Sequence, residues 1–152
     1  MKYFHLLLVS ILITACRQAG TSSKTALSSA SADTATWVTF TGTLPCADCS
    51  GVVTSLTLHM QQEEPDFQFR MKEIYQGLKS GRDETLTSEG TYSILRGNAA
   101  NPDATIIQLN PDKDKNLQRF FLRVGDQELK QLDKNQLPIE GSLNYSLKRE
   151  PS

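Results

Sequence analysis

This sequence has no large excess of charge of either sign, few long apolar runs and little helical periodicity. Its 152 residues include 16 Lys and Arg against 17 Asp and Glu, which gives a formal net charge of −1. Binding to nucleic acid calls for a clustered basic surface, so this balance argues against a nucleic-acid partner. From residue 37 onward, no stretch shows the apolar spacing of an amphipathic helix. The composition therefore favours a nearly neutral domain built from strands.

The one long apolar run lies at residues 6–13, after the positive charge of Lys2. It is too short to cross a bilayer as a mature helix, so we interpret residues 1–15 as a secretory signal peptide. The run closes with Ile13-Thr14-Ala15-Cys16, which resembles the lipobox of bacterial lipoproteins. That resemblance implies cleavage before Cys16 and lipidation of its thiol, with acyl chains such as palmitate. A membrane is therefore the first predicted partner, reached through the lipid on Cys16.

Residues 16–36 are rich in Ser, Thr and Ala and show no apolar periodicity. This composition predicts a disordered tether, which at roughly 3.3 Å per residue would reach tens of ångströms from a membrane. Arg17 stands next to the lipidated position, where enteric lipoproteins retained in the inner membrane carry Asp. The expected location is therefore the cell envelope, lipid-anchored in the outer membrane and facing the periplasm.

Alternation of polar and apolar residues dominates residues 37–149, which have the length of one ordinary domain. The spacing of half-buried strands recurs at residues 53–60, 67–75, 84–95, 105–109, 118–124, 128–132 and 143–148. The pattern slips near Glu73, which indicates a bulge. Gly90 indicates a bend within residues 84–95, where we expect a pair of strands. About eight short strands predict an all-β fold, a small antiparallel meander barrel whose closure removes exposed edges.

Cys46 and Cys49 form a Cys-x-x-Cys pair in a loop flanked by Pro45 and Gly51. Three interpretations stay open for this loop. A structural disulfide is the default in an oxidising compartment. A clamp for monovalent copper is also apt, because two thiolates suffice for this soft ion but cannot fill a tetrahedral zinc site. A thioredoxin-like redox centre has the weakest support, since no helix follows to lower a thiol pKa.

Other polar residues near the loop give weaker signals. Asp48 lies between the cysteines, but Asp in such a turn more often bonds its own backbone. Ser50 lacks the Gly-x-Ser-x-Gly frame of an activated nucleophile, and we predict no enzymatic activity. His59 and Met60 come about 30 Å further along the next strand, at ~3.3 Å per residue. We expect them in the core or at the rim rather than as further metal ligands.

Two groups of residues are assigned to surfaces. Glu63, Glu64 and Asp66 form an acidic turn, which we interpret as a solvated face. Phe120 and Phe121 place one ring on each side of a strand. We expect the outward ring to pack on a loop or on a partner.

The run Leu44-Pro45-Cys46-Ala47-Asp48-Cys49-Ser50-Gly51, which precedes Val52-Val53-Thr54-Ser55-Leu56, resembles the signature of a known family. The family is NlpE, a group of copper-resistance and envelope-stress lipoproteins, and the likeness is to its N-terminal domain. Weaker matches are Glu89-Gly90-Thr91-Tyr92, Leu137-Pro138-Ile139-Glu140 and Leu143-Asn144-Tyr145-Ser146-Leu147. The resemblance covers residues 37–148.

The resemblance implies a lipocalin-like β-barrel on the outer membrane, linked to copper tolerance and to envelope stress sensing through an envelope signalling protein. Two-domain members add a C-terminal module, and signalling through that module is not expected of this chain. Two other functions stay open. In one, the barrel carries a small apolar ligand and the Cys46/Cys49 pair is a structural disulfide. In the other, the barrel is an adaptor that docks another envelope protein.

Overall fold

The computed structural model describes residues 36–60, 67–79 and 81–151. The predicted signal peptide, the lipidation site Cys16 and the tether to residue 35 lie outside the described residues, as does the acidic turn at residues 63–66. Within the described ranges the regular elements are strands, and no helix is long and apolar enough to cross a membrane.

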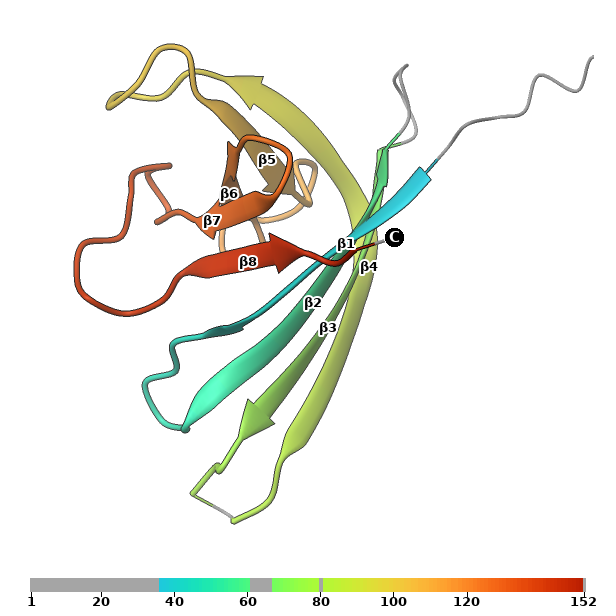
Figure 1. Cartoon of the computed structure of the whole chain (residues 1–152), viewed down its shortest axis with the longest axis vertical. Coiled ribbons are helices and arrows are strands. Elements are labelled where there is room, and N and C mark those ends of the chain that lie inside the picture. The colour runs from blue at the N-terminus through green and yellow to red at the C-terminus, as the bar shows by residue number, and fades with distance from the viewer. Residues whose placement is uncertain (1–35, 61–66, 80, 152) are drawn as a thin grey trace, which may run out of the picture. The chain divides into compact units, whose positions relative to one another are not determined.

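Eight antiparallel strands follow one another and close into a barrel (Figure 1). They are β1 (Thr36–Leu44), β2 (Gly51–Met60), β3 (Gln68–Gln76), β4 (Glu84–Arg96), β5 (Thr105–Leu109), β6 (Arg119–Val124), β7 (Glu128–Gln131) and β8 (Ser146–Arg149). Each pairs with its neighbour in sequence, and β8 returns to β1 through Phe40↔Arg149 and Thr41↔Lys148. The predicted all-β meander barrel is therefore confirmed.

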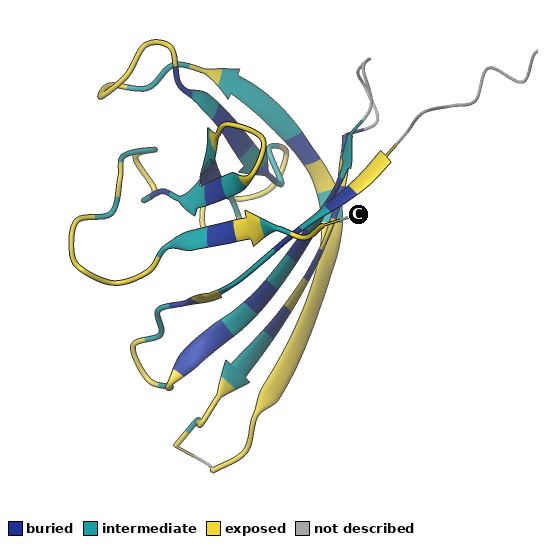
Figure 2. Ribbon diagram, viewed as in Figure 1, coloured by how far each residue is buried: buried dark blue, intermediate teal, exposed yellow. Residues whose placement is uncertain are grey.

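The barrel interior is filled by the apolar half of each alternating strand. Phe40, Phe69 and Phe121 are the largest fully buried side chains, and they belong to one core cluster with Leu56 and Leu58. Figure 2 shows the resulting bands, buried and intermediate along β2, and buried and exposed along β3. Because side chains alternate across a strand, this banding is what the sequence pattern predicts.

A second, smaller cluster lies outside the barrel wall. Phe120 packs there with Ala104, Ile106 and Leu132. Register pairs Gln108 with Phe120 and Ile106 with Leu122, which places these four residues on the same, outward side of β5 and β6. The outward ring of the Phe120-Phe121 pair is thus covered by residues of this chain.

Two local predictions are corrected by the strand register. No bulge occurs at Glu73, because β3 stays in continuous register from Phe69 to Tyr75 and Glu73 points inward despite its charge. The expected pair of strands at residues 84–95 is one continuous strand, β4, which changes neighbour from β3 to β5 after Thr91. A charged residue that points inward interrupts the alternation of apolar residues, and so does a strand that changes its neighbour. From the sequence alone, these interruptions look the same as a bulge or a turn.

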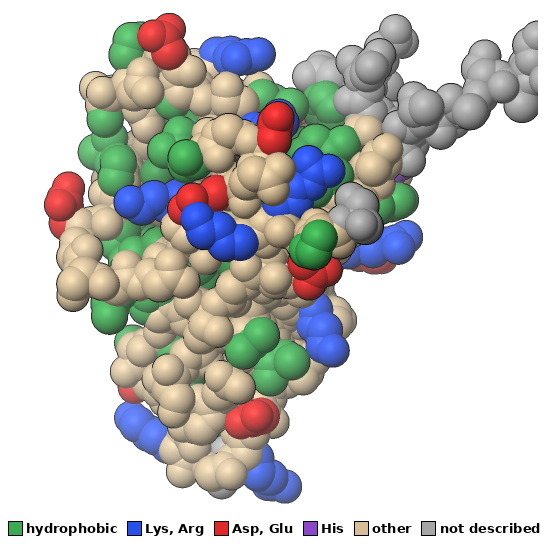
Figure 3. All heavy atoms as spheres, in the orientation of Figure 1, with side chains coloured by type: hydrophobic (Ala, Val, Ile, Leu, Met, Phe, Trp, Pro, Cys, Tyr) green, Lys and Arg blue, Asp and Glu red, His purple; other side chains and the backbone are tan. Residues whose placement is uncertain are grey.

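Acidic and basic side chains are interspersed over the face of the molecule shown in Figure 3. Exposed pairs of opposite charge include Lys79 with Asp48 and Arg123 with Asp126. The mixing agrees with the nearly balanced composition.

Tyr92 is buried in the barrel, and its side chain joins β4 to the backbone of β2. Its hydroxyl donates a hydrogen bond to the carbonyl oxygen of His59, at 3.0 Å, and its ring stacks on Phe67. Burial raises the pKa of Tyr92 to about 12, although the positive charge of Arg123 acts in the opposite direction. The phenol therefore stays protonated in the folded state at pH values where an unfolded chain releases its proton.

We expect this phenol to make the folded state sensitive to alkali. Because its folded pKa is raised, its contribution to stability is complete below pH 10 and is lost as pH rises through about 12. Tyr92→Phe should lose about 1 kcal/mol of unfolding free energy at neutral pH, from the missing hydrogen bond. Between pH 10 and 12 the variant should lose less further stability than the parent, as measured by urea unfolding. Parallel pH curves for the two proteins would contradict the assignment.

Candidate functional site at the barrel mouth

The Cys-x-x-Cys loop joins β1 to β2 at one end of the barrel. The Sγ atoms of Cys46 and Cys49 are 2.06 Å apart and form a disulfide, with their Cα atoms 5.3 Å apart. The amide of Ser50 donates a hydrogen bond to the carbonyl oxygen of Gln76, at 2.8 Å. This bond extends the pairing of β2 with β3 into the loop. The strands on either side therefore fix the loop, and the turn brings the two sulfurs together.

The loop lies at the surface of the domain. Cys46 and Cys49 are both partly exposed, and Ala47 and Asp48 between them are exposed. Asp48 pairs with Lys79 at 3.3 Å, but both side chains are largely in solvent. Such exposed ion pairs contribute little to stability. The loop is thus anchored by backbone bonds and the disulfide, while its tip remains open to a reactant or a partner.

Cys46 also borders a cavity of about 540 Å³ at the mouth of the barrel. Its apolar lining includes Leu44, Val52 and Phe120, whereas Gln118 and Lys134 supply polar groups. This volume lies in the range of small-molecule sites in proteins. Cys46 is therefore part of the cavity wall, where a molecule bound in the cavity could contact it.

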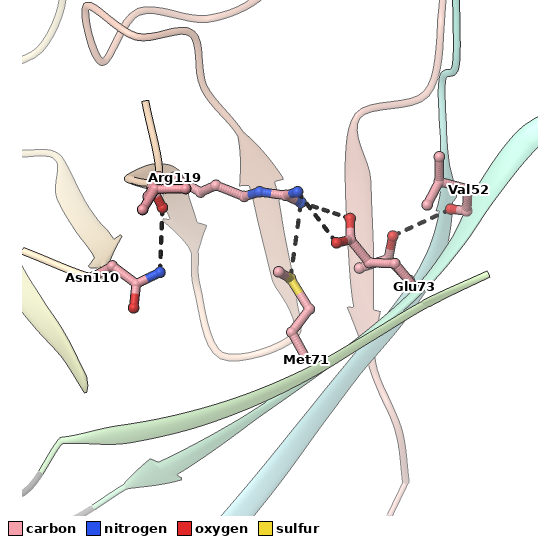
Figure 4. A network of polar contacts seen from close by, with 7 residues as sticks. Val52, Met71, Glu73, Asn110 and Arg119 are labelled. Carbon is pink, nitrogen blue, oxygen red and sulfur yellow. Dashed lines mark hydrogen bonds and ion pairs between the residues drawn. The ribbon is translucent and has the colours of Figure 1, made fainter. Parts of the chain in front are cut away.

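A partly buried ion pair crosses the barrel and lines the same cavity (Figure 4). Arg119 of β6 donates to both carboxylate oxygens of Glu73 on β3, with Nη1–Oε1 at 2.6 Å and Nη2–Oε2 at 3.2 Å. The side chain of Glu73 is 8% exposed and that of Arg119 is 34% exposed. Burial tends to lower the pKa of Arg119, but its hydrogen bond and charge pairing with Glu73 outweigh this effect and raise it. Because β3 and β6 are not neighbours in the sheet, the pair ties opposite walls together.

The sequence-based predictions did not include this ion pair. The sequence does indicate one half of it, because continuing the alternation from Phe69 through Met71 puts Glu73 on the inward side. Arg119 likewise occupies the inward position two residues before the buried Phe121. An inward acid and an inward base on different strands indicate a cross-barrel pair, although only the fold shows that they meet.

The Cys46–Cys49 pair offers two sulfur donors to a metal ion. Among the residues that the structure describes, no group of three or more His, Cys, Asp and Glu could hold an ion. His59 and Met60 lie at the far end of β2, as expected, and the His59 ring packs on Trp37 with centroids 4.5 Å apart. As a disulfide the pair has no thiolate to offer. Once reduced, its two soft donors fit monovalent copper better than zinc.

Fold and loop together define a small closed antiparallel barrel with a disulfide loop at its mouth. A family model described as the NlpE N-terminal domain matches residues 40–142. The chain belongs to this family. A relative named Lipoprotein NlpE, from Escherichia coli (strain K12), is 32% identical over 106 residues, which cover 70% of this chain and 38% of that protein. No solved structure matches the chain significantly.

The resemblance seen in the sequence is thereby confirmed. Both cysteines and the residues that line the mouth cavity lie inside the matched residues, whereas residues 36–39 of β1 and the whole of β8 lie outside them. The chain spans 38% of the length of the Escherichia coli relative. The match therefore identifies the domain of this chain, and the function of the longer Escherichia coli protein is not transferred to it.

Proposed function

We propose that this protein is a non-enzymatic envelope lipoprotein, anchored through Cys16, whose Cys46–Cys49 loop alternates between a disulfide and a dithiol that binds monovalent copper. The observation that carries the proposal is the loop itself, in which two cysteines sit within bonding distance at an accessible barrel mouth. Membership of the NlpE N-terminal domain family supports the envelope setting. Outer-membrane residence on the periplasmic side and contact with an envelope signalling protein belong to the same proposal.

The exchange between the two forms balances as a two-electron step. An external dithiol breaks the Cys46–Cys49 bond, becomes a disulfide itself and passes two electrons and two protons to the loop. Monovalent copper then displaces the thiol protons, because thiolates are the ligands. The oxidised and copper-bound forms exclude each other. The loop would thus report both the redox poise and the copper level of the compartment.

Copper titration of the mature lipoprotein in detergent tests this proposal. After reduction with a phosphine under nitrogen, the protein should bind about one monovalent copper ion per chain against a colorimetric chelator, because two thiolates complete a linear site. The oxidised protein should bind none. Cys46→Ser should lose nearly all binding, whereas Ser50→Ala in the same loop should retain it.

A Cys46→Ser variant that binds copper as tightly as the reduced parent would defeat the copper clamp. The disulfide would then be a staple, and the loop would have no role in metal binding.

The mouth cavity favours a second candidate, a carrier for a small apolar ligand. The cavity of about 540 Å³ has several apolar walls and borders Cys46. A carrier would retain a lipid-like molecule through purification, detectable by native mass spectrometry. Its occupancy would not depend on copper, which separates the two functions.

A further inference from the structure

The first half of β4 has a strand on one side only. Residues 84–91 pair with β3, whereas β5 pairs with residues 92–96. The last bond on the β5 side runs from the amide of Asn110 to the carbonyl oxygen of Thr91, at 2.8 Å. At Asn110 the chain takes a positive φ of 55° and turns away. Figure 1 shows the lower part of β4 with β3 as its single neighbouring strand.

The backbone groups along this edge are free to pair with another strand. The amide of Tyr92 points to the β3 side, where it donates to Phe67, and the carbonyl of Thr91 points to the β5 side. Because these directions alternate along an antiparallel strand, Thr85, Thr87 and Glu89 turn their N–H and C=O groups away from β3. No hydrogen bond to these groups occurs among the described residues. The open edge, residues 84–90, is about 23 Å long at ~3.3 Å per residue.

A slot of about 350 Å³ runs beside the open edge. Met71 and Leu109 contribute to its lining from within the barrel. Leu86 on β4 and Leu117 on the loop opposite also line it and are 46% and 59% exposed. The Oδ1 atom of Asn110, at the closed end, is buried and has no hydrogen-bond donor. Lys113 and the Glu73–Arg119 ion pair supply charged groups to the same lining. The slot therefore combines exposed apolar side chains with these charges, beside the unpaired backbone groups of the open edge.

This edge lacks the usual protection against strand addition. Natural edges carry lysine, proline or a bulge, and residues 84–90 contain no Lys, Arg or Pro. Their charges are those of Glu84 and Glu89, both exposed. Figure 2 colours this half of β4 as exposed. A strand that pairs here would be favoured by basic residues of its own.

We propose that the open edge of β4 and the adjoining slot form a docking site for an extended segment of a partner protein. The segment adds as a strand to β4, inserts apolar side chains at alternate positions toward Leu86 and Leu117, and carries flanking Lys or Arg that face Glu84 and Glu89. Such strand addition takes its affinity from main-chain bonds and its specificity from pockets for alternate side chains. The cysteines do not line the slot, although the slot shares Glu73, Asn116 and Arg119 with the mouth cavity.

A second copy of this chain fits the edge less well. Two open edges side by side would bring together four glutamates and no basic residue from residues 84–90. Glu84 and Glu89 point to opposite faces of β4, so their repulsion acts at a distance and not between directly opposed side chains. The acidic edge therefore favours a basic strand from another protein over its own copy.

Hydrogen exchange with a synthetic strand tests the site. The probe is the capped peptide Thr-Lys-Leu-Thr-Leu-Thr-Lys, added to the lipoprotein in detergent. In an antiparallel pair with residues 84–90, its last Lys shares the face of its leucines and lies across from Glu84, and its first Lys lies on the opposite face, across from Glu89. The probe should slow exchange of the amides of Thr85, Thr87 and Glu89, and it should bind more tightly than the same peptide with Asp in place of both Lys. Thr87→Pro removes an outward N–H and leaves the β3 ladder intact, so it should weaken binding about tenfold or more. Thr87→Ala, which keeps that N–H, is the matched control.

Leu86→Lys provides a second, independent variant, because it puts a charge into the slot at a half-exposed position. It should also abolish peptide binding, while Leu143→Lys at another exposed leucine should not. Absence of protection at the three amides, or protection confined to other strands, overturns the proposal. Concentration-dependent dimers in sedimentation that Thr87→Pro dissolves would overturn it in favour of a second copy as the occupant.

Discussion

Phe121→Ala is expected to lower the free energy of unfolding by about 4 kcal/mol, since large-to-small changes of a buried ring cost 3–5 kcal/mol. Phe121 has 0% exposure and belongs to the main core cluster with Phe40 and Phe69. The strands around it are closed into a barrel, so they cannot collapse freely onto the missing ring. Urea unfolding followed by circular dichroism gives the number directly.

The matched control is Leu143→Ala, because Leu143 is 62% exposed and lies outside the core. It should change stability by less than about 0.5 kcal/mol. Equal losses of stability in the two variants would contradict the assignment of Phe121 to the core.

Arg119→Met is expected to cost about 3 kcal/mol, because it leaves the buried carboxylate of Glu73 without its partner. The estimate is at the low end for buried pairs, since Arg119 is one-third exposed and water can reach the vacated space. The double variant Glu73→Leu/Arg119→Met removes both charges. It should recover most of the lost stability, because the neighbouring Met71 already makes this part of the wall apolar.

Chemical denaturation of the two variants at pH 7 distinguishes an unpaired buried charge from a simple loss of packing. In the first case the double variant is more stable than Arg119→Met. A double variant that is less stable than Arg119→Met would mean that packing of the long side chains, and not the charge pair, holds β3 to β6.

The alternation of apolar residues was sufficient to predict the barrel and most of its interior. Leu56 and Leu58, placed on one face from spacing alone, are both fully buried. The pattern could not predict which strands stay together along their full length. The sequence of β4 suggests two strands because its first half is exposed and its second half is mostly half-buried or buried. The two halves differ in burial because β5 covers only the second half.

The candidate site was predictable only where its residues are adjacent in the sequence. Cys46 and Cys49 lie in one loop, so their spacing alone predicts a pair. The cavity beside them is assembled from Leu44, Phe120 and Ile139, which come from three distant parts of the chain. No local pattern carries that information, because it depends on how the strands close.

Closure of the barrel has a mechanical consequence if the chain is anchored through Cys16, as we propose. β1 and β2 share nine register pairs, from Thr36 to Leu44, whereas β1 and β8 share two. Two further bonds reinforce the shorter junction: the amide of Glu150 donates to the carbonyl oxygen of Thr39, and the side-chain amide of Asn144 donates to that of Thr43. A pulling force that reaches the domain at Thr36 is therefore borne mostly by the β1–β2 hairpin. The β1–β8 seam has two register pairs, whereas every other junction of the barrel has three or more, and parting it would turn the closed barrel into an open sheet.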